Sequence, residues 1–366
     1  MISLLQNPML AADIGFWEWP IKVLAVLAVV LLPAGTTVYL YLFKMVSFMQ
    51  SRLGPMEAGP YGTMQLLAEV GKNLQKEDIF PAKADRTVFA LAPYVVLTST
   101  FLLALVIPFG PDAGFASLDT GTFDARNFDG AGVFYAMAVT SISVVGILMA
   151  GWASASKYSL MGGLRAAGQL IAYELPLILA IVGVVIQAGT LSLQGIVYSQ
   201  YHTEIFGFGG IGLPYILTQF VGFLIFMIAV QAELTQAPFD MPIAESELVS
   251  GYLTEYSGFR FLMFFIGEFA TAAIFGFLAS VLFLGGWAVP PFLSDLLGID
   301  INSNWFNFIG PAVMAIKMLV LTFIIYWVRF TYPRFREDQL QKFAWKVLIP
   351  ISLLNIAATG VLKVAF

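Results

Sequence analysis

Five carboxylates lie close together in a stretch that is flanked by long apolar runs. The stretch reads AELTQAPFDMPIAESELVSGYLTEYSG from Ala232 and contains no Lys and no Arg. Neighbouring carboxylates in a low-dielectric setting disfavour one another's charged forms, so such a set binds protons near neutral pH and titrates as a coupled group. These residue types therefore predict proton uptake or relay at the edge of a membrane. The carboxylates are Glu233, Asp240, Glu245, Glu247 and Glu255.

A purely structural explanation accounts for part of this cluster. The pattern predicts a loop followed by a short amphipathic helix, with Asp240 as its N-cap and Pro242 in its first turn. Acids near a helix start complement its dipole, which explains Glu245 and Glu247 but not Glu233 or Glu255. The expected helix has its apolar side chains on one face: Leu248, Val249, Tyr252, Leu253 and Tyr256.

The composition is that of a polytopic membrane protein. Of 366 residues, 59% are hydrophobic and 11% are charged, whereas soluble domains carry roughly 25% charged residues. The net charge of −5 argues against nucleic acid as a partner. There is no Cys and one His, His202, which excludes all-cysteine iron–sulfur clusters and a bis-histidine haem in this chain. Electrons for any redox role must come from another subunit.

We expect an all-α membrane protein with a single domain and eight transmembrane helices, because each apolar run is long enough to span a bilayer. Regular structure within lipid must satisfy every backbone group, which favours helices. The expected spans are 20–47, 87–108, 131–153, 166–189, 210–232, 260–288, 308–329 and 345–365.

The basic residues predict the orientation of these spans. The loops at 48–86, 154–165, 233–259 and 330–344, together with the adjoining helix ends, hold 14 of the 18 Lys and Arg residues. By the positive-inside rule these loops are cytoplasmic, and both termini lie on the outer side of a bacterial cytoplasmic membrane. The acidic stretch lies on the same side against this trend.

Two further features bear on function. Residues 63–76 alternate apolar and basic side chains with helical spacing, which predicts an amphipathic surface helix in the first cytoplasmic loop.

Glu174, Glu268 and Lys317 are ionisable residues deep within expected spans. Lys317 lies too far from either end of its span to snorkel comfortably, so we expect it to meet a carboxylate or a water-filled cavity.

Several long motifs resemble one known family. They are the acidic stretch, GWASASKYSLMGGLRAAGQLIAYE, RLGPMEAGPYG with KEDIFP, FLGGW, and TYPRFREDQL with WKVLIP. In this order and spacing they resemble the H subunit of NADH-quinone oxidoreductase, the membrane subunit of respiratory complex I beside its peripheral arm. The resemblance runs from about Phe48 to Pro350. It implies eight membrane helices with outside termini, and cytoplasmic loops that form part of a ubiquinone or menaquinone chamber.

The resemblance also implies roles for individual residues and partners. FMN and iron–sulfur clusters would lie in partner subunits, and quinone would be the substrate. Arg329, Arg334 and Arg336 would dock the peripheral arm or lipid head groups, with ordinary positive-inside signalling as the alternative. The residues implied for the quinone chamber and its coupling to the membrane arm are Glu233, Asp240, Glu245, Glu247, Glu255, Glu174, Glu69, Asp78, Arg52, Lys157, Arg165 and Phe239.

This sequence departs from the family pattern at five positions near the implied chamber. Leu42 and Phe43 stand where the family usually has a Glu-Arg pair, and Glu57 stands where it has Arg. Gln236 replaces an Arg and Ile243 replaces a Glu within the acidic stretch. These departures affect the expected access route of the quinone and the proton path.

Two other function classes compete with a quinone-linked proton pump. One is the homologous membrane subunit of an energy-converting hydrogenase or formate hydrogenlyase. The other is an autonomous transporter, which would not need such long cytoplasmic motifs. Copurified flavin would favour the quinone-linked pump, and nickel would favour the hydrogenase.

Overall fold

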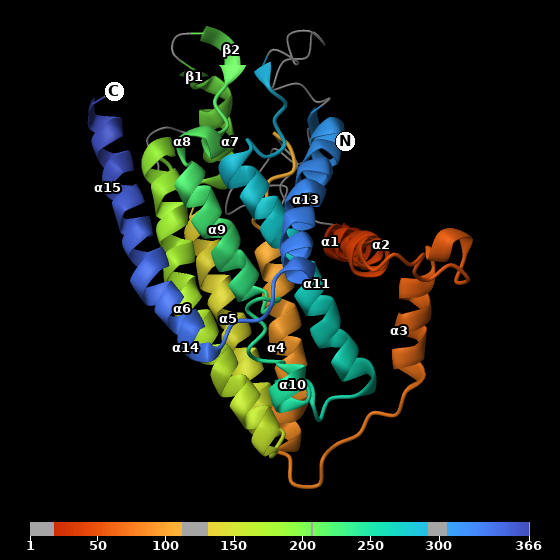
Figure 1. Ribbon diagram of the computed structural model, residues 1–366. Helices are drawn as coiled ribbons and strands as arrows, with labels where there is room; N and C mark the ends of the chain where they lie inside the picture. Colours follow the sequence, from red (N-terminus) through yellow and green to blue (C-terminus); the bar gives the residue numbers. More distant parts are fainter. Residues whose placement is uncertain (1–17, 112–130, 206–207, 292–305, 366) are drawn as a thin grey trace.

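The computed structural model describes residues 18–111, 131–205, 208–291 and 306–365. A bundle of long helices forms its body (Figure 1). The long helices are α1 (Glu18–Thr37), α4 (Arg86–Ala104), α5 (Gly132–Ala153), α6 (Lys157–Ala188), α9 (Phe220–Glu233), α11 (Gly258–Phe283), α13 (Phe306–Thr331) and α15 (Ile349–Ala365). In the described ranges, seven helical stretches are long and apolar enough to cross a membrane. This confirms the predicted all-α polytopic class.

Shorter elements connect these helices. On the side of the acidic stretch they are η3 (Val38–Met45), α2 (Val46–Met49), η4 (Pro60–Gly62), α3 (Gln65–Gln75), α10 (Glu245–Leu248), η5 (Gly251–Leu253), α14 (Glu337–Phe343) and η6 (Ala344–Leu348). At the opposite end lie α7 (Leu193–His202), α8 (Tyr215–Thr218) and an antiparallel hairpin of β1 (Glu204–Ile205) and β2 (Phe208–Gly212). The predicted surface helix at 63–76 is confirmed as α3.

The expected fifth span is not one continuous helix. Its first residues form β2, and the helix that follows is broken at Gln219 between α8 and α9. The Gln219 side chain donates to Thr359 Oγ1 at 2.7 Å and accepts from Asn355 Nδ2 at 2.9 Å, both on α15. The 14 residues of α9 reach only about 21 Å at 1.5 Å per residue. This network ties the break in the fifth span to the last helix.

The cytoplasmic loop predicted at 154–165 is also shorter than expected. The 32-residue helix α6 begins at Lys157, so most of that segment is helical. An α-helix of this length is about 48 Å long, more than a bilayer core needs. As a result α6 carries Arg165 from the expected loop on the same rigid element as Glu174.

The predicted amphipathic helix in the acidic stretch is wrong. The chain instead makes the short α10 and η5, with Val249 at φ 67° after α10 and Gly251 at φ 56° at the start of η5. A Cβ at Gly251 would lie 1.7 Å from the Pro242 carbonyl oxygen, so the local turn requires glycine. Tyr252 and Tyr256 are nevertheless buried as the pattern predicted, whereas Val249 is exposed.

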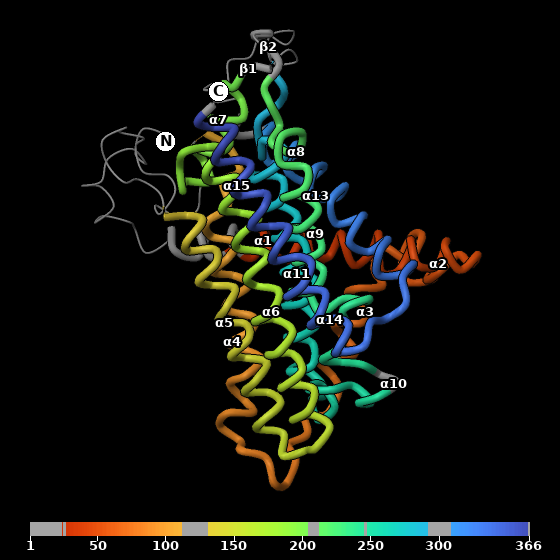
Figure 2. The backbone as a smooth tube through the Cα atoms, turned by 60° about the vertical axis from the view of Figure 1, so that its left-hand side comes forward, coloured from red at the N-terminus to blue at the C-terminus, as the bar shows by residue number. Residues whose placement is uncertain are grey.

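Helix α1 crosses the bundle instead of running along it. Figure 1 views it nearly along its axis and Figure 2 from the side, where it continues through η3 into α2. It packs chiefly on α11. The Tyr41 hydroxyl in η3 donates to the Leu319 carbonyl on α13, and its ring stacks on Tyr326 with centroids 5.6 Å apart. These contacts hold the crossing helix against α11 and α13.

Glycines let the central helices approach closely. A Cβ at Gly151 on α5 would lie 3.0 Å from the Gly163 Cα on α6. The neighbouring Gly162 faces the other way, and a Cβ there would lie 2.6 Å from the Tyr252 backbone nitrogen. Small residues permit such backbone contacts between membrane helices. Gly162 therefore sets how near η5 lies to α6.

Replacing Gly162 with alanine tests this contact. We expect Gly162→Ala to destabilise the assembled complex by about 1–3 kcal/mol, because the added methyl group overpacks against backbone. Thermal unfolding of the purified complex measures the change. Gly168→Ala, on the same helix, is the matched control, since its new Cβ would meet its nearest atom at 3.8 Å. Equal melting temperatures for both variants would contradict the assigned role of Gly162.

Candidate functional site

Two separate spaces lie beside the acidic stretch. The first, which we call the chamber, has a volume of about 350 Å³ and lies between α3, η5 and the start of α11. Polar and apolar surfaces share its wall. It brings together the segments expected as loops at 48–86 and 233–259. Its lining is Leu66, Glu69, Val70, Lys72, Asn73, Lys76, Ser250, Leu253, Thr254, Tyr256, Phe261, Leu262 and Phe265.

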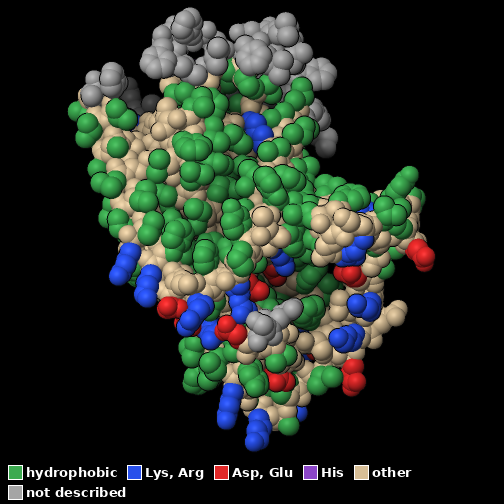
Figure 3. Space-filling model, viewed as in Figure 1, with side chains coloured by type: hydrophobic (Ala, Val, Ile, Leu, Met, Phe, Trp, Pro, Cys, Tyr) green, Lys and Arg blue, Asp and Glu red, His purple; other side chains and the backbone are tan. Residues whose placement is uncertain are grey.

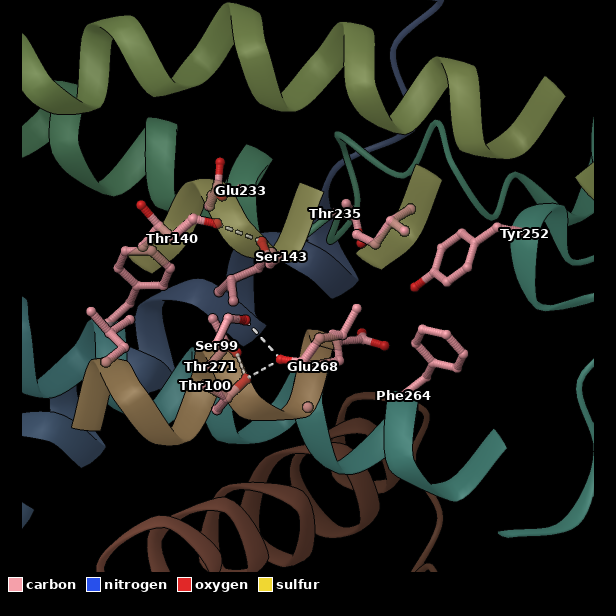
Figure 4. A pocket seen from close by; sticks show the side chains of 16 residues that line it. Ser99, Thr100, Thr140, Ser143, Glu233, Thr235, Tyr252, Phe264, Glu268 and Thr271 are labelled. Carbon is pink, nitrogen blue, oxygen red and sulfur yellow. Dashed lines mark hydrogen bonds between the residues drawn. The ribbon is translucent and has the colours of Figure 1, made fainter. Parts of the chain in front are cut away.

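The second space, the membrane cavity, lies among the long helices and has a volume of about 60 Å³. Glu233 from α9 and Glu268 from α11 line it, with hydroxyl groups from α4, α5 and α11 around them (Figure 4). Thr100 and Thr271 are hydrogen-bonded across it at 2.9 Å. A polar space of this size has room for several water molecules. The hydroxyl-bearing residues that line it are Ser99, Thr100, Thr140, Ser143, Thr235, Tyr252 and Thr271.

The short segment η5 forms a wall that the two spaces share. Tyr252 lines the membrane cavity, while Leu253 and Thr254 line the chamber. Burial raises the pKa of Tyr252, and the charges of Glu268 and Asp240 raise it further. The tyrosine therefore stays protonated and keeps a hydroxyl donor between the two spaces.

Glu268 has two partners that both favour its ionised form, one a neutral amide and the other a guanidinium. It accepts a hydrogen bond from the buried Gln236 amide. Arg329 at the end of α13 places Nη1 3.8 Å from a Glu268 oxygen. That nitrogen is buried and has no hydrogen bond to any residue that the structure describes. Arg329 is thus an internal counter-charge for Glu268, and the predicted docking role does not fit its position.

Glu233 and Glu174 extend the acidic groups along α9 and α6. Glu174 accepts a hydrogen bond from the Ser141 hydroxyl and lies near enough to Glu233 for their charges to interact. Glu233 Oε2 is buried and has no hydrogen-bond partner among the described residues. Buried polar atoms are normally paired, so this oxygen is suited to a water molecule or a proton.

Glu247 behaves differently from the buried acids. It accepts from Arg165 Nη1 at 2.6 Å and from Arg334 Nη2 at 3.0 Å. The hydrogen bond from Arg165 and the positive charge of Arg334 lower the pKa of Glu247 below its ordinary value. The prediction that this residue takes up protons near neutral pH is therefore wrong, because two arginines from distant parts of the chain converge on it.

This ion-paired group borders an open depression on the charged end of the molecule. Figure 3 shows charged side chains gathered at this end, below helices whose surface is mostly hydrophobic. The depression has a volume of about 720 Å³. Arg336, 81% exposed, pairs with Asp338 at 3.5 Å on its rim. Its lining is Arg165, Met241, Glu247, Arg336, Glu337, Asp338 and Gln341.

Asp78 helps to fasten the first loop to α11. It accepts from Arg260 Nη1 at 2.6 Å, and the Arg260 guanidinium lies 3.9 Å from the Phe80 ring centroid. The Ser257 hydroxyl donates to the Glu77 carbonyl at 2.9 Å. These contacts position the mouth of the chamber, so Asp78 acts there by holding the loop.

Several predicted site residues lie outside both spaces. Arg52 donates to Gln50 at 2.7 Å on an exposed loop, and Lys157 is exposed at the tip of α6. Phe239 is buried in the core against Tyr173, with ring centroids 5.2 Å apart. Glu255 is half-buried before α11. Glu245 lies in α10, but its side chain is outside the described part of the structure.

Among the described residues, Lys317 contacts backbone carbonyls instead of the carboxylate or water-filled cavity predicted for it. Its ammonium group donates to three backbone carbonyls just past the end of α11, those of Leu284 and Gly286 at 2.7 Å and Ala288 at 2.9 Å. A helix end leaves carbonyls without partners, and an ammonium group offers three donors. Lys317 therefore caps α11 from α13.

Sequence reasoning missed the hydroxyl residues of the membrane cavity and the partners of Glu268. One signal was present, because hydroxyl residues cluster in two apolar runs, as LTST around Ser99 and TSIS around Ser141. Polar residues in an apolar helix favour its interior face. The approach of Gln236 and Arg329 to Glu268 had no comparable local signal.

Comparisons with known proteins agree with this architecture. A family model described as NADH dehydrogenase matches residues 21–360. The H subunit of the NADH-quinone oxidoreductase of Brevibacillus brevis is 42% identical over 362 residues, which cover 99% of this chain and 97% of the relative. The protein of the same name from Bacillus cytotoxicus is 43% identical over 324 residues, 88% of this chain and 87% of the relative. This chain therefore belongs to the family of NADH-quinone oxidoreductase H subunits, whose model and members match it along most of its length.

Proposed function

We propose that this chain forms part of the quinone-binding chamber of a proton-pumping NADH:quinone oxidoreductase and couples quinone reduction to proton movement in the membrane. The names of the relatives support the class of complex. The observation that carries the coupling role is that one segment, η5, lines both the chamber and the membrane cavity. A change of charge on one side of η5 then acts electrostatically on the carboxylates on the other side.

The chamber suits a quinone, whose head group is polar and whose tail is apolar. Glu69, Lys72 and Asn73 of α3 provide polar contacts, and Phe261 and Phe265 of α11 provide apolar ones. Reduction to quinol consumes two electrons and two protons. The electrons come from FMN and iron–sulfur clusters in partner subunits, since this chain has no Cys and a single His. Ubiquinone and menaquinone share this head-group chemistry, and either fits the proposal.

Proton movement would follow the buried acids. Negative charge that develops in the chamber raises the proton affinity of carboxylates behind η5. Asp240 and Glu268 are the nearest, since their charges both act on Tyr252. Glu233, beside the hydroxyl groups of the membrane cavity, and Glu174 continue the series into the bundle. In this proposal the proton passes along the whole series, and no single carboxylate holds it throughout.

The charged end supplies the contacts with partner subunits. Glu247, held by Arg165 and Arg334, joins α6 to the segment before α14. Arg336 keeps an exposed side chain at that position, so we assign the peripheral-arm contact to it instead of to Arg329. With the charged loops in the cytoplasm, the end of α15 lies on the outer side of a bacterial inner membrane. Other complex I subunits and lipid are then the remaining partners.

The alternatives receive less support. The relatives carry the quinone-linked name, so the hydrogenase interpretation is not favoured. A chamber assembled from two cytoplasmic loops has no use in an autonomous transporter, but it fits a subunit that completes its site with a peripheral partner.

The first test removes an acid from the membrane cavity. We expect Glu233→Gln to lower quinone reduction and proton pumping together by roughly a hundred-fold or more, because a positioned proton-transfer group is lost while its shape is kept. Electron transfer from NADH to an artificial acceptor in the assembled complex stays unchanged, since that chemistry lies in partner subunits. Glu57→Gln is the control, as Glu57 is exposed and lines neither space. Wild-type quinone reduction and pumping in Glu233→Gln would refute the coupling role.

The second test uses the lowered pKa of Glu247. A carboxyl group with a lower pKa in the folded state adds stability above its unfolded pKa, and this stability disappears as the pH falls through the folded pKa. We therefore expect a small melting-temperature difference between wild type and Glu247→Gln at neutral pH. The difference shrinks as the pH falls below about 4.5, the ordinary value for Glu. A melting difference that is the same at every pH would assign the effect to packing.

A further inference from the structure

An apolar groove lies where α4, α5 and α6 reach the charged end of the molecule. Its volume is about 340 Å³, and its wall is almost wholly apolar. Figure 2 shows the three helices side by side. Val145, Leu148 and Trp152 of α5 and Leu160 and Leu164 of α6 form its sides.

The groove follows from the glycine contact between α5 and α6. Gly151 and Gly163 bring the two backbones together, and Gly163 lies in the groove wall. The large side chains on either side of this contact then project outward around a deep furrow. Trp152 is 75% exposed, and tryptophan near the end of a membrane helix is typical of the lipid–water boundary.

Three basic side chains lie just beyond the groove. Lys83 precedes α4, Arg86 begins it, and Lys157 begins α6, and all three are exposed. The Asp85 amide donates to the Ala153 carbonyl at 3.2 Å, which brings the turn before α4 beside the end of α5. Among the described residues, none of the three forms an ion pair.

One acid lies among these basic residues. Asp85 Oδ1 accepts from the Thr87 and Val88 amides as the N-cap of α4, which occupies the oxygen that faces the helix. The start of α6 has no side-chain cap, so its amides and dipole add to the positive field. The rim remains positive overall, with three basic residues against one acid.

We propose that this groove and its basic rim bind one anionic phospholipid, with its phosphate at Lys83, Arg86 and Lys157 and an acyl chain along Trp152 and Leu164. The apolar furrow matches a hydrocarbon chain, and it ends where the positive rim begins. A helix of a partner subunit would satisfy the furrow but would also need acids at its end to match the rim. The site lies apart from the chamber and the membrane cavity, so lipid binding there is separate from the proposed coupling role.

The test uses the purified, assembled complex and a phosphatidylglycerol whose acyl chain carries a diazirine. After illumination, mass spectrometry locates the crosslinked peptides. We expect crosslinks within residues 145–164 that unlabelled phosphatidylglycerol suppresses and phosphatidylcholine does not. Neutralising Lys83, Arg86 and Lys157 to Gln should weaken labelling by roughly five-fold for each charge removed.

Two further variants separate the parts of the site. Val145→Phe fills the furrow from an exposed position, so it should reduce labelling while the rim is intact. Lys342→Gln with Lys346→Gln removes exposed charges from another helix end and should leave labelling unchanged. If the triple variant does not assemble, competition by the two unlabelled lipids on the wild-type complex still tests whether the groove prefers an anionic head group.

Two outcomes would overturn the proposal. Equal suppression by phosphatidylcholine and phosphatidylglycerol would show ordinary contact with bulk lipid. Absence of lipid crosslinks within residues 145–164 would show that something other than lipid, such as a partner helix, covers the groove.

Discussion

The backbone contact at Gly162 is the constraint on which the candidate site depends. Because α6 has no side chain there, the Gly251–Tyr252 peptide lies directly against it. In that position η5 lies between the two spaces. Leu253 and the following Thr254 line the chamber, and Tyr252 lines the membrane cavity. A larger residue at Gly162 would push η5 away from α6 and separate the two spaces. The glycine thus sets the distance over which charge in one space acts on the other.

The charged residues in the bundle and at its charged end have different partners, and these partners indicate different roles. Lys317 has three carbonyl acceptors, and it caps a helix. Glu247 has two arginines and remains ionised. Glu233 has a buried oxygen with no partner in the described residues, and Glu268 lies between a neutral amide and a guanidinium at 3.8 Å. The last two are the carboxylates best suited to change protonation, because Glu233 has a buried oxygen without a partner among the described residues and the counter-charge of Glu268 is 3.8 Å away.

Features encoded by local pattern were predictable from the sequence, and features that depend on distant contacts were not. Apolar run lengths predicted the membrane helices, and helical spacing predicted α3 and the burial of Tyr252. The break at Gln219 depends on side chains of α15, more than a hundred residues away. The loss of the expected helix after Asp240 depends on a turn that Gly251 makes against Pro242. The positive-inside rule treated Arg329, Arg334 and Arg336 as one group. In the folded chain they pair with three different acids, which are Glu268, Glu247 and Asp338 in that order.

The departures from the family pattern have unequal consequences. Leu42 and Phe43 pack against the hydrophobic core, so apolar contact replaces the usual charged pair. Glu57 is exposed on the loop after α2 and lines neither space. Gln236 is the departure that touches the site, because its amide donates to Glu268 where the family pattern has a guanidinium. A neutral donor stabilises the carboxylate less than a cation does, which leaves Arg329 as the counter-charge for Glu268 in the described residues. In this chain the proton affinity of Glu268 therefore depends on the end of α13, the same helix that leads into the segment carrying Arg334 and Arg336.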